Sequence, residues 1–154
     1  MQDTDVPMLR SAFEVAVRAR ENGNHAFGAI IVSPRGELLL AAENSVVTER
    51  DVTGHAELNL VRAVTKVHAP EVLQTCTMYS SAEPCPMCAA SIVWANIRRV
   101  VYGLSMEGIY QMFADAPADS PSLRMHSRVV LDAAPWPVEV VGPELEDEAR
   151  AVFG

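Results

Sequence analysis

The hydrophobic residues near the start of the chain follow a helical pattern and then a strand-like one. Apolar side chains recur at helical spacing from about Pro7, and the Asn-Gly pair at 22–23 is a typical helix stop. Two short apolar runs, Ala29–Val32 and Leu38–Ala42, then flank the turn residues 34–36. The pattern predicts one helix and then two strands that are joined by a tight turn and covered on both faces.

Helices and strands alternate through the middle of the chain. Helical spacing returns from Leu58 to Val67, and Thr77–Ser80 has the composition of a third strand. The segment Cys88–Ala95 is apolar almost all round, which predicts a buried helix, and Arg99–Tyr102 predicts a fourth strand.

The pattern is weaker in the last third of the chain. Glu107–Phe113 is compatible with a helix, and Ala114–Ser122 contains two prolines and is expected to be a loop. Val138–Val141 suggests a fifth strand and Leu145–Phe153 a closing helix. A hairpin followed by alternating helices and strands indicates an α/β sheet with helices on both faces, and we expect residues 1–154 to form a single domain.

The charge and composition of the chain indicate which binding partners are excluded and which cellular compartment to expect. The 154 residues carry a formal net charge of −8, which argues against a surface that binds nucleic acid or anionic lipid. The longest apolar run, Ala26–Val32, is too short to span a membrane, and the polar N-terminus does not resemble a signal peptide. Two of the three cysteines form a C-x-x-C motif. We therefore expect a cytoplasmic protein with reduced thiols.

Two motifs bring metal-binding chemistry to this chain. His55-Ala56-Glu57 is followed 27 residues later by Pro84-Cys85-Pro86-Met87-Cys88. Cysteines three residues apart share one face of a helix. Because proline is tolerated only in the first turn of a helix, Pro86 predicts that a helix begins beside the two thiols. His55 and Glu57 are two apart, a spacing that shares a face only where a helix has just begun. The spacing predicts two helix starts that converge on one zinc ion, with His55, Cys85 and Cys88 as ligands.

The same residues predict a catalytic site with Glu57 as its proton carrier. Three protein ligands leave the fourth tetrahedral position open, as in catalytic zinc sites. Two thiolates formally cancel the charge of Zn²⁺, so the metal acidifies water weakly and a neighbouring base is needed. We assign Glu57 to take a proton from the attacking water, pass it to a ring nitrogen of the substrate and protonate the departing amine.

Two simpler interpretations of these motifs stay open. A C-x-x-C motif by itself is also typical of thiol redox proteins. A closed structural zinc site would need a fourth protein ligand, for which Cys76 and His68 are the candidates. The His-Ala-Glu triplet upstream argues against a redox motif, and a closed zinc site would leave Glu57 without a purpose.

The motifs resemble the cytidine deaminase-like superfamily, and its guanine deaminase and tRNA adenosine deaminase branch most. The specific part of the resemblance covers roughly Phe27 to Gly103. It implies a three-layer α/β/α sandwich with a mixed five-stranded sheet, one zinc ion per subunit and a homodimer. By motif position it assigns zinc to His55, Cys85 and Cys88 and the proton shuttle to Glu57, and it gives Asn44 and the Ala56 N–H to the substrate base.

The resemblance also leads to expectations about the substrate. Phe27 and Trp94 match residues that line the base pocket of guanine deaminases, although Trp94 on a helix that is apolar all round also fits a core position. A carboxylate after the fourth strand recognises the purine edge in those enzymes, and here Asp115 is the nearest counterpart, with Glu107 as its rival. We therefore expect deamination of a free base, with guanine first and cytosine or another small amino-heterocycle as the alternative. The acidic composition disfavours tRNA.

Overall fold

Five strands form one mixed sheet in the order β2-β1-β3-β4-β5 in the computed structural model, which describes all 154 residues. Strand β1 (Gly28–Val32) pairs antiparallel with β2 (Leu38–Glu43) and with β3 (Thr77–Ala82). Strand β4 (Arg99–Leu104) runs parallel to β3, and β5 (Glu139–Val141) runs parallel to β4. The predicted hairpin and all five predicted strands are confirmed.

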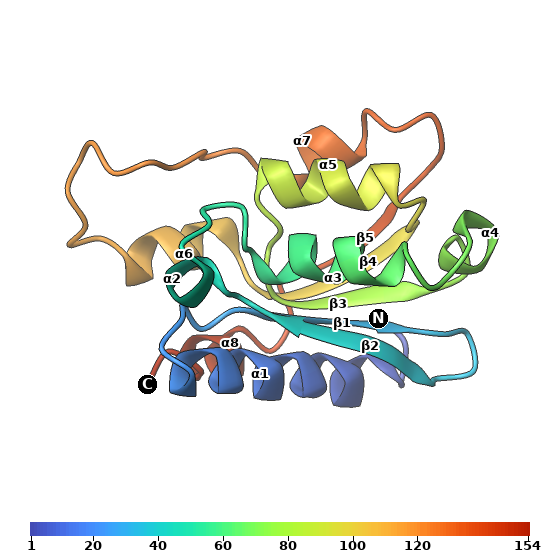
Figure 1. Cartoon of the computed structure of the whole chain (residues 1–154), viewed down its shortest axis with the longest axis horizontal. Helices are drawn as coiled ribbons and strands as arrows, with labels where there is room; N and C mark the ends of the chain where they lie inside the picture. The colour runs from blue at the N-terminus through green and yellow to red at the C-terminus, as the bar shows by residue number, and fades with distance from the viewer.

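Helices cover both faces of the sheet, so the fold is the expected three-layer α/β/α sandwich (Figure 1). Helices α1 (Asp5–Glu21) and α8 (Glu146–Ala151) lie on one face, and α3 (Ala56–Val64) and α5 (Pro86–Trp94) lie on the other. The remaining helices are short: α2 (Val46–Glu49), α4 (Pro70–Leu73), α6 (Met106–Met112) and α7 (Ser127–Leu131). None of the helices combines the length and the hydrophobicity that a membrane crossing requires.

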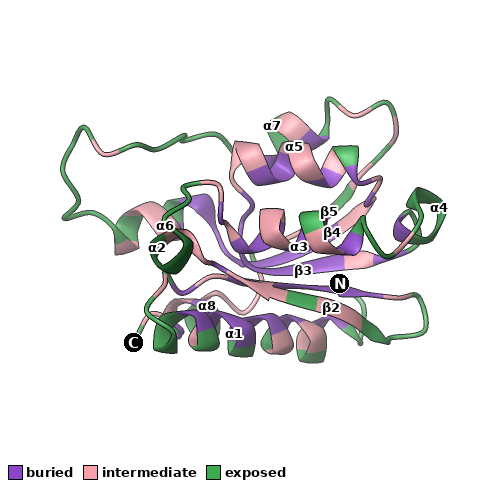
Figure 2. Cartoon of the chain, viewed as in Figure 1, coloured by how far each residue is buried: buried purple, intermediate pink, exposed green.

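Each face of the sheet has its own apolar core, and the strands alternate their side chains between the two. The central strands β1, β3 and β4 are buried along most of their length (Figure 2). Ile31 and Met78 pack toward α3 and α5, whereas their neighbours Ile30 and Tyr79 pack toward α1. Strands that are covered on both sides carry apolar residues without alternation, which is the pattern of β1 in the sequence.

A glycine at the start of β1 sets the distance between the sheet and α1. A Cβ atom built on Gly28 would lie 2.4 Å from the backbone nitrogen of Ala16 and 2.7 Å from the carbonyl oxygen of Ala12. Only glycine allows the α1 backbone to approach the strand so closely.

Two expectations about burial were wrong. Strand β2 is an edge strand and is half-exposed rather than covered on both faces. Helix α5 is apolar all round, but it buries only Cys88, Ala89 and Ile92, and Trp94 at its end is 89% exposed. Hydrophobicity on every side of a helix implies burial only when something packs against every side, and here the sheet supplies one face.

Candidate functional site

Both metal-binding motifs lie at helix starts, as their spacing predicts. His55 precedes the first residue of α3 and has an extended backbone, so its side chain and that of Glu57 share one side of the helix start. Cys85 occupies the same position before α5, and Pro86 is the first residue of that helix. Strand β3 leads directly into this second start through Glu83 and Pro84. The site therefore lies where two helices begin on the same face of the sheet.

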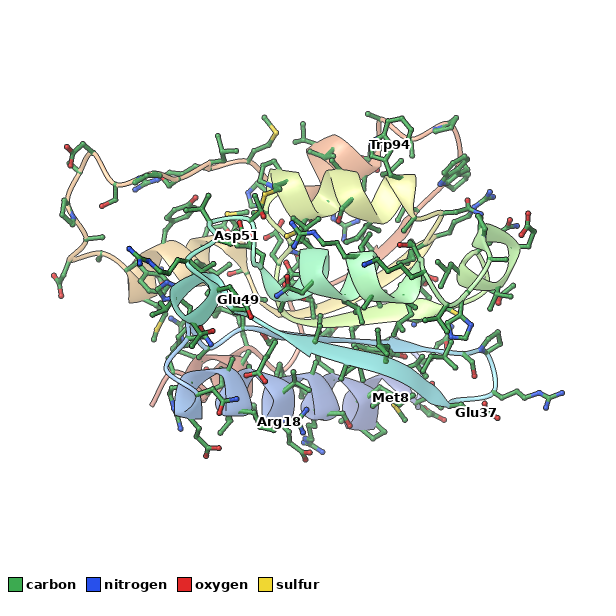
Figure 3. The ribbon with its side chains drawn as sticks, viewed as in Figure 1. Met8, Arg18, Glu37, Glu49, Asp51 and Trp94 are labelled. Atoms are coloured by element: carbon green, nitrogen blue, oxygen red, sulfur yellow. The ribbon has the colours of Figure 1, made fainter.

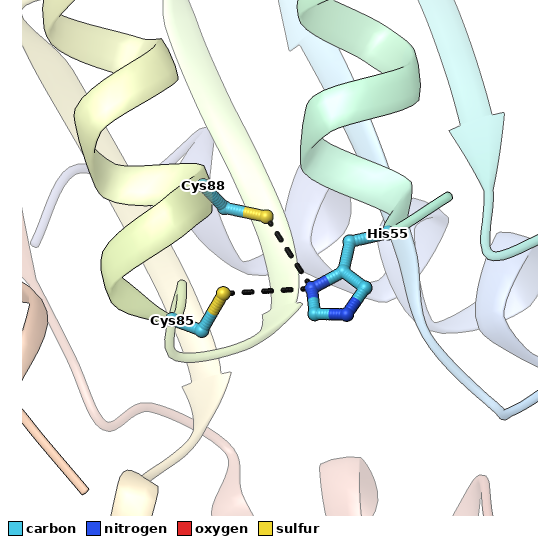
Figure 4. Close-up of side chains that lie close together, drawn as sticks. All are labelled: His55, Cys85 and Cys88. Atoms are coloured by element: carbon cyan, nitrogen blue, oxygen red, sulfur yellow. Dashed lines mark hydrogen bonds between the residues drawn. The ribbon is translucent and has the colours of Figure 1, made fainter. Parts of the chain in front are cut away.

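The three predicted ligand side chains converge on one point (Figure 4). The Nδ1 atom of His55 lies 3.4 Å from the Sγ atom of Cys85 and 3.6 Å from that of Cys88. Zinc bonds of about 2.3 Å to sulfur and about 2.0 Å to nitrogen at tetrahedral angles separate these atoms by about 3.5 Å. The donor set thus fits zinc in both chemistry and spacing. Neither Cys76 nor His68, the candidates for a closed structural site, belongs to the cluster.

The two thiols of the cluster differ strongly in acidity. A hydrogen bond from Cys88, together with the contact with His55, lowers the pKa of the Cys85 thiol to about 4 despite its partial burial. The pKa of the Cys88 thiol is raised, chiefly by its hydrogen bond to Cys85 and by its burial. The Cys85 thiolate also raises the pKa of His55. Cys85 is therefore ready to bind a cation as a thiolate, the form that ligates metals.

Glu57 is the buried carboxylate of the site. It is 6% exposed and lines the same cavity as His55 and Cys85. Burial, reinforced by the Cys85 thiolate, raises the pKa of Glu57 to about 7. A carboxyl group with a pKa near neutrality both accepts and returns a proton readily at physiological pH.

A cavity of about 730 Å³ opens above the ligand cluster. Ten of its 21 lining residues belong to the segment 113–124, which follows α6. His55 and Cys85 of the ligand cluster also line it, together with Glu57, Asn44 and Phe27. The cavity is within the range of about 300–1,000 Å³ that is usual for small-molecule sites.

Asn44 presents a free hydrogen-bond donor to this cavity. The residue is 2% exposed, its backbone N–H donates to the carbonyl of Phe27, and its Oδ1 atom accepts from the N–H of Val46. These contacts fix the side chain and leave the Nδ2 amide without a partner in the chain. An amide donor held in this way suits a carbonyl oxygen of a heterocyclic base.

Three phenylalanines form the apolar wall beside Asn44. The ring of Phe27 packs against that of Phe113 at 6.5 Å between centroids and edge-on against that of Phe153 at 5.4 Å. Phe27 and Phe113 line the cavity, whereas Phe153 of the C-terminal segment supports them from behind. Phe27 therefore lies in the cavity wall, and its contact with a base stays a prediction.

Two residues expected to bind the substrate, Trp94 and Ala56, are not among those that line the cavity. Trp94 is 89% exposed at the far end of α5 and does not line the cavity (Figure 3), because the start of α5, not its end, faces the cavity. Ala56 packs its side chain into the core and is not among the lining residues. That the backbone N–H of Ala56, in the first turn of α3, binds the substrate stays a prediction.

The carboxylates expected to recognise a purine edge also lie outside the cavity. Asp115 is exposed and does not line it, although its neighbours Ala114 and Ala116 do. Glu107 is exposed as well, and it pairs with His126 at 2.9 Å. Both expectations followed sequence position, whereas the path of the loop decides which of its side chains face inward.

Several lining residues have no counterpart in the sequence-based assignment. They include His25, Tyr110 and Arg124, with the Arg124 guanidinium over the Tyr110 ring at 4.5 Å. Glu83 also lines the cavity, and its side chain is buried. An acidic residue between a buried strand and a ligand cysteine is a signal that the sequence offers for Glu83. The loop residues carry no such signal.

Comparison with known proteins identifies the family to which this site belongs. Residues 2–104 match the family model of the cytidine and deoxycytidylate deaminase zinc-binding region. The chain belongs to this family. Its members are zinc-dependent hydrolytic deaminases. The matched segment contains both motifs and ends with β4, so the loop after α6, which forms much of the cavity wall, lies outside it.

Similar proteins differ in the substrates that their names report. The chain is 42% identical to the probable cytosine deaminase of Schizosaccharomyces pombe, over 97% of this chain and 90% of that protein. It is also 42% identical to guanine deaminase of Bacillus subtilis, over 49% of this chain and 48% of that protein. A solved structure of guanine deaminase from Nitrosomonas europaea has the same fold, with a TM-score of 0.76 and 22% identity over 95% of this chain and 80% of that one.

Proposed function

We propose that this chain deaminates a free nucleobase by hydrolysis, with His55, Cys85 and Cys88 as zinc ligands and Glu57 as the proton carrier. Water replaces the exocyclic amino group of the base by a carbonyl oxygen, and ammonia leaves. His55, Cys85 and Cys88 would hold the zinc ion, which would supply a Lewis acid for the attacking water.

The protein's own groups account for binding and for proton transfer. Phe27 offers an apolar ring to the face of the base, and the Nδ2 amide of Asn44 donates to its carbonyl oxygen. A carboxylate oxygen of Glu57 accepts a proton from the attacking water and delivers it to a ring nitrogen. The same carboxylate then takes the second proton of the added water oxygen and gives it to the amine, which leaves as ammonia while the carbonyl forms. Glu57 is buried and lines the same cavity as His55 and Cys85, which places its carboxyl group beside the attacking water.

Cytosine is the substrate that the cavity supports best. Only two carboxylates, Glu57 and Glu83, line it, and the side chain of Glu83 already accepts hydrogen bonds from several protein donors. No further carboxylate is free to bind the N–H groups of a purine edge. This observation carries the preference for a pyrimidine. The similarity of nearly the whole chain to a probable cytosine deaminase supports it.

Guanine is the second candidate. About half of the chain is 42% identical to a guanine deaminase, and the cavity volume accommodates a purine. An RNA substrate is disfavoured by the formal net charge of −8, because RNA binding relies on cationic side chains.

An ammonia-release assay on cytosine, guanine, adenine and cytidine, with tRNA as a fifth substrate, tests this proposal. We expect release from cytosine with uracil as the product, and none from the zinc-loaded Glu57→Gln variant. Release from guanine alone would favour the second candidate. Activity on tRNA without activity on any free base would overturn the proposal of a free-base enzyme.

We also propose that a second copy of the chain covers the exposed end of α5. Trp94, Val93 and Ala90 form an apolar surface there with Val130 of α7 and Trp136. We call this surface the tryptophan face. It is almost free of polar groups, with Arg98 stacked on Trp136 at its border. An apolar patch of this kind is typical of protein interfaces, and a twofold dimer would place Trp94 of each copy against the same face of the other.

A further inference from the structure

The buried carboxylate of Glu83 joins two segments that lie far apart in the sequence. Its Oε2 atom accepts a hydrogen bond from the N–H of Met106 at 2.8 Å. Its Oε1 atom accepts from the N–H of Ser127 at 3.0 Å and from the Ser127 hydroxyl at 3.2 Å. Met106 is the first residue of α6, and Ser127 is the first residue of α7. One side chain therefore binds the starts of two helices.

These two anchors stand on either side of the outer cavity wall. Helix α6 leads into residues 113–126, which have no regular secondary structure and end at the start of α7. This segment supplies ten of the 21 residues that line the cavity. We call it the wall loop. A loop of this length has few internal hydrogen bonds, so its position depends on what holds its ends and its neighbours.

The anchor is chemically strong and is placed close to the ligand cluster. The first N–H groups of a helix have no partner within the helix and carry a partial positive charge, and a carboxylate is the acceptor that suits them best. The side chain of Glu83 is only 2% exposed, so water does not weaken these bonds. Glu83 lies two residues before Cys85, on the turn that starts the ligand helix.

His126 extends the anchor toward the surface. Its Nδ1 atom lies 3.2 Å from Oε1 of Glu83, and its Nε2 atom lies 2.9 Å from Oε1 of Glu107 on α6. The imidazole thus bridges the end of the wall loop and the outer side of α6. A metal ion is a poorer interpretation of these three side chains, because the two ring nitrogens face different carboxylates and both oxygens of Glu83 already have N–H donors.

We propose that Glu83 is a positioning residue that holds the wall loop against the substrate cavity by accepting hydrogen bonds from the first residues of α6 and α7. The proposal rests on the assignment of this cavity as the substrate site. The sequence Glu83-Pro84-Cys85 then has two separate functions. Cys85 binds the metal, and Glu83 holds the wall loop beside the base.

Two variants test the two sets of contacts: Glu83→Gln changes the hydrogen bonds to the helix starts, and His126→Ala changes the bridge between Glu83 and Glu107. The amide of glutamine keeps one acceptor oxygen and turns an NH₂ group toward the other helix start, so one arm of the anchor is lost. His126→Ala removes only the outer bridge. Asp5→Asn is the matched control, because it breaks a buried ion pair with Arg99 and a hydrogen bond with Tyr79, at the opposite ends of β3 and β4, without touching the wall loop.

Hydrogen exchange of residues 113–126 is the readout that does not depend on activity. In Glu83→Gln we expect exchange in this segment to accelerate by roughly tenfold or more, the equilibrium factor of one charged hydrogen bond, with the zinc content unchanged. KM for the base should rise by about the same factor while kcat changes less. His126→Ala should show a smaller effect in the same direction, and Asp5→Asn should show neither effect.

Two results would overturn the inference. One is unchanged exchange in the wall loop of Glu83→Gln. The other is loss of zinc from Glu83→Gln with wall-loop exchange no faster than in Asp5→Asn, which would make Glu83 a support of Cys85 only. If the wild-type protein deaminates no free base, the proposed function fails, but the exchange comparison still decides whether Glu83 holds the loop.

Discussion

The ring of Phe153, the penultimate residue, packs edge-on against the ring of Phe27, with 5.4 Å between the centroids. The C-terminal segment therefore supports the cavity from behind. It is kept there by the Arg10–Glu148 ion pair at 2.9 Å and by Glu146, which accepts a hydrogen bond from the N–H of Ser105 at 3.0 Å. The end of the chain thus contributes to the site although it lies well beyond residue 104, the last one matched to the family model.

Removing the Phe153 ring should loosen the apolar wall without disturbing the chemistry. An edge-to-face aromatic pair contributes about 0.5–1.5 kcal/mol, so Phe153→Ala should raise KM for the base by roughly two- to tenfold and leave zinc content unchanged. Phe153→Leu should recover part of the loss. Steady-state kinetics with both variants check this, and an unchanged KM in Phe153→Ala would show that the wall does not need the third ring.

The three cysteines should separate into two ligands and one core residue. Purified protein should contain about one zinc ion per chain, and Cys85→Ser or Cys88→Ser should lose most of it together with activity. Cys76→Ser is the control, because its sulfur is buried beside the carbonyl of Val72 at 3.3 Å, outside the ligand cluster. Elemental analysis gives the answer. Zinc loss in Cys76→Ser but not in Cys85→Ser would contradict the assignment.

The buried ion pair of Asp5 and Arg99 should make the fold sensitive to acid. Burial raises the pKa of Asp5, but hydrogen bonds from Arg99, the Gln2 N–H and Tyr79 outweigh it and lower the pKa from 3.8 to about 2. A carboxyl group whose pKa is lower in the folded state stabilises the fold above its unfolded pKa, and this contribution is lost as the pH falls from about 4 to 2.

The variant Asp5→Asn isolates this contribution. It should reduce the free energy of unfolding by about 2 kcal/mol at pH 7 and by much less near pH 2, where the wild-type carboxyl group is itself protonated. Urea unfolding at both pH values measures the difference. An equal loss at the two pH values would mean that packing, not charge, explains the role of Asp5.

Disrupting the tryptophan face should change the oligomeric state and leave the monomer folded. Light scattering should give wild-type protein a mass of twice 16.7 kDa, and Trp94→Glu should shift it toward a single chain. Leu38→Glu is the control, because Leu38 is also exposed, at 49%, but lies at the start of the edge strand β2. A monomeric wild-type protein would refute the proposed dimer.

The elements of the fold were largely predictable from the sequence because their signals are local. Apolar runs marked the strands, and helical spacing marked α1 and α3. The short helices α2, α4 and α7 were not predicted, since four or five residues are too few for a periodic pattern. The exposure of Trp94 was also not predictable, because burial depends on what packs against a helix and not on its own composition.

The placement of the ligand residues at two helix starts followed from the sequence by itself, because a helix start fixes where neighbouring side chains point. The spacing of His55 and Glu57 and the proline after Cys85 place all of these groups at the starts of α3 and α5. What surrounds the cluster was decided only by the tertiary structure. The sheet order brings the two helix starts together, and the path of a loop without a periodic pattern turns Asp115 outward while a buried carboxylate, Glu83, holds the ends of that loop. Local backbone geometry is encoded by neighbours in the chain, whereas the choice of which side chains face a cavity depends on contacts between residues that are far apart in it.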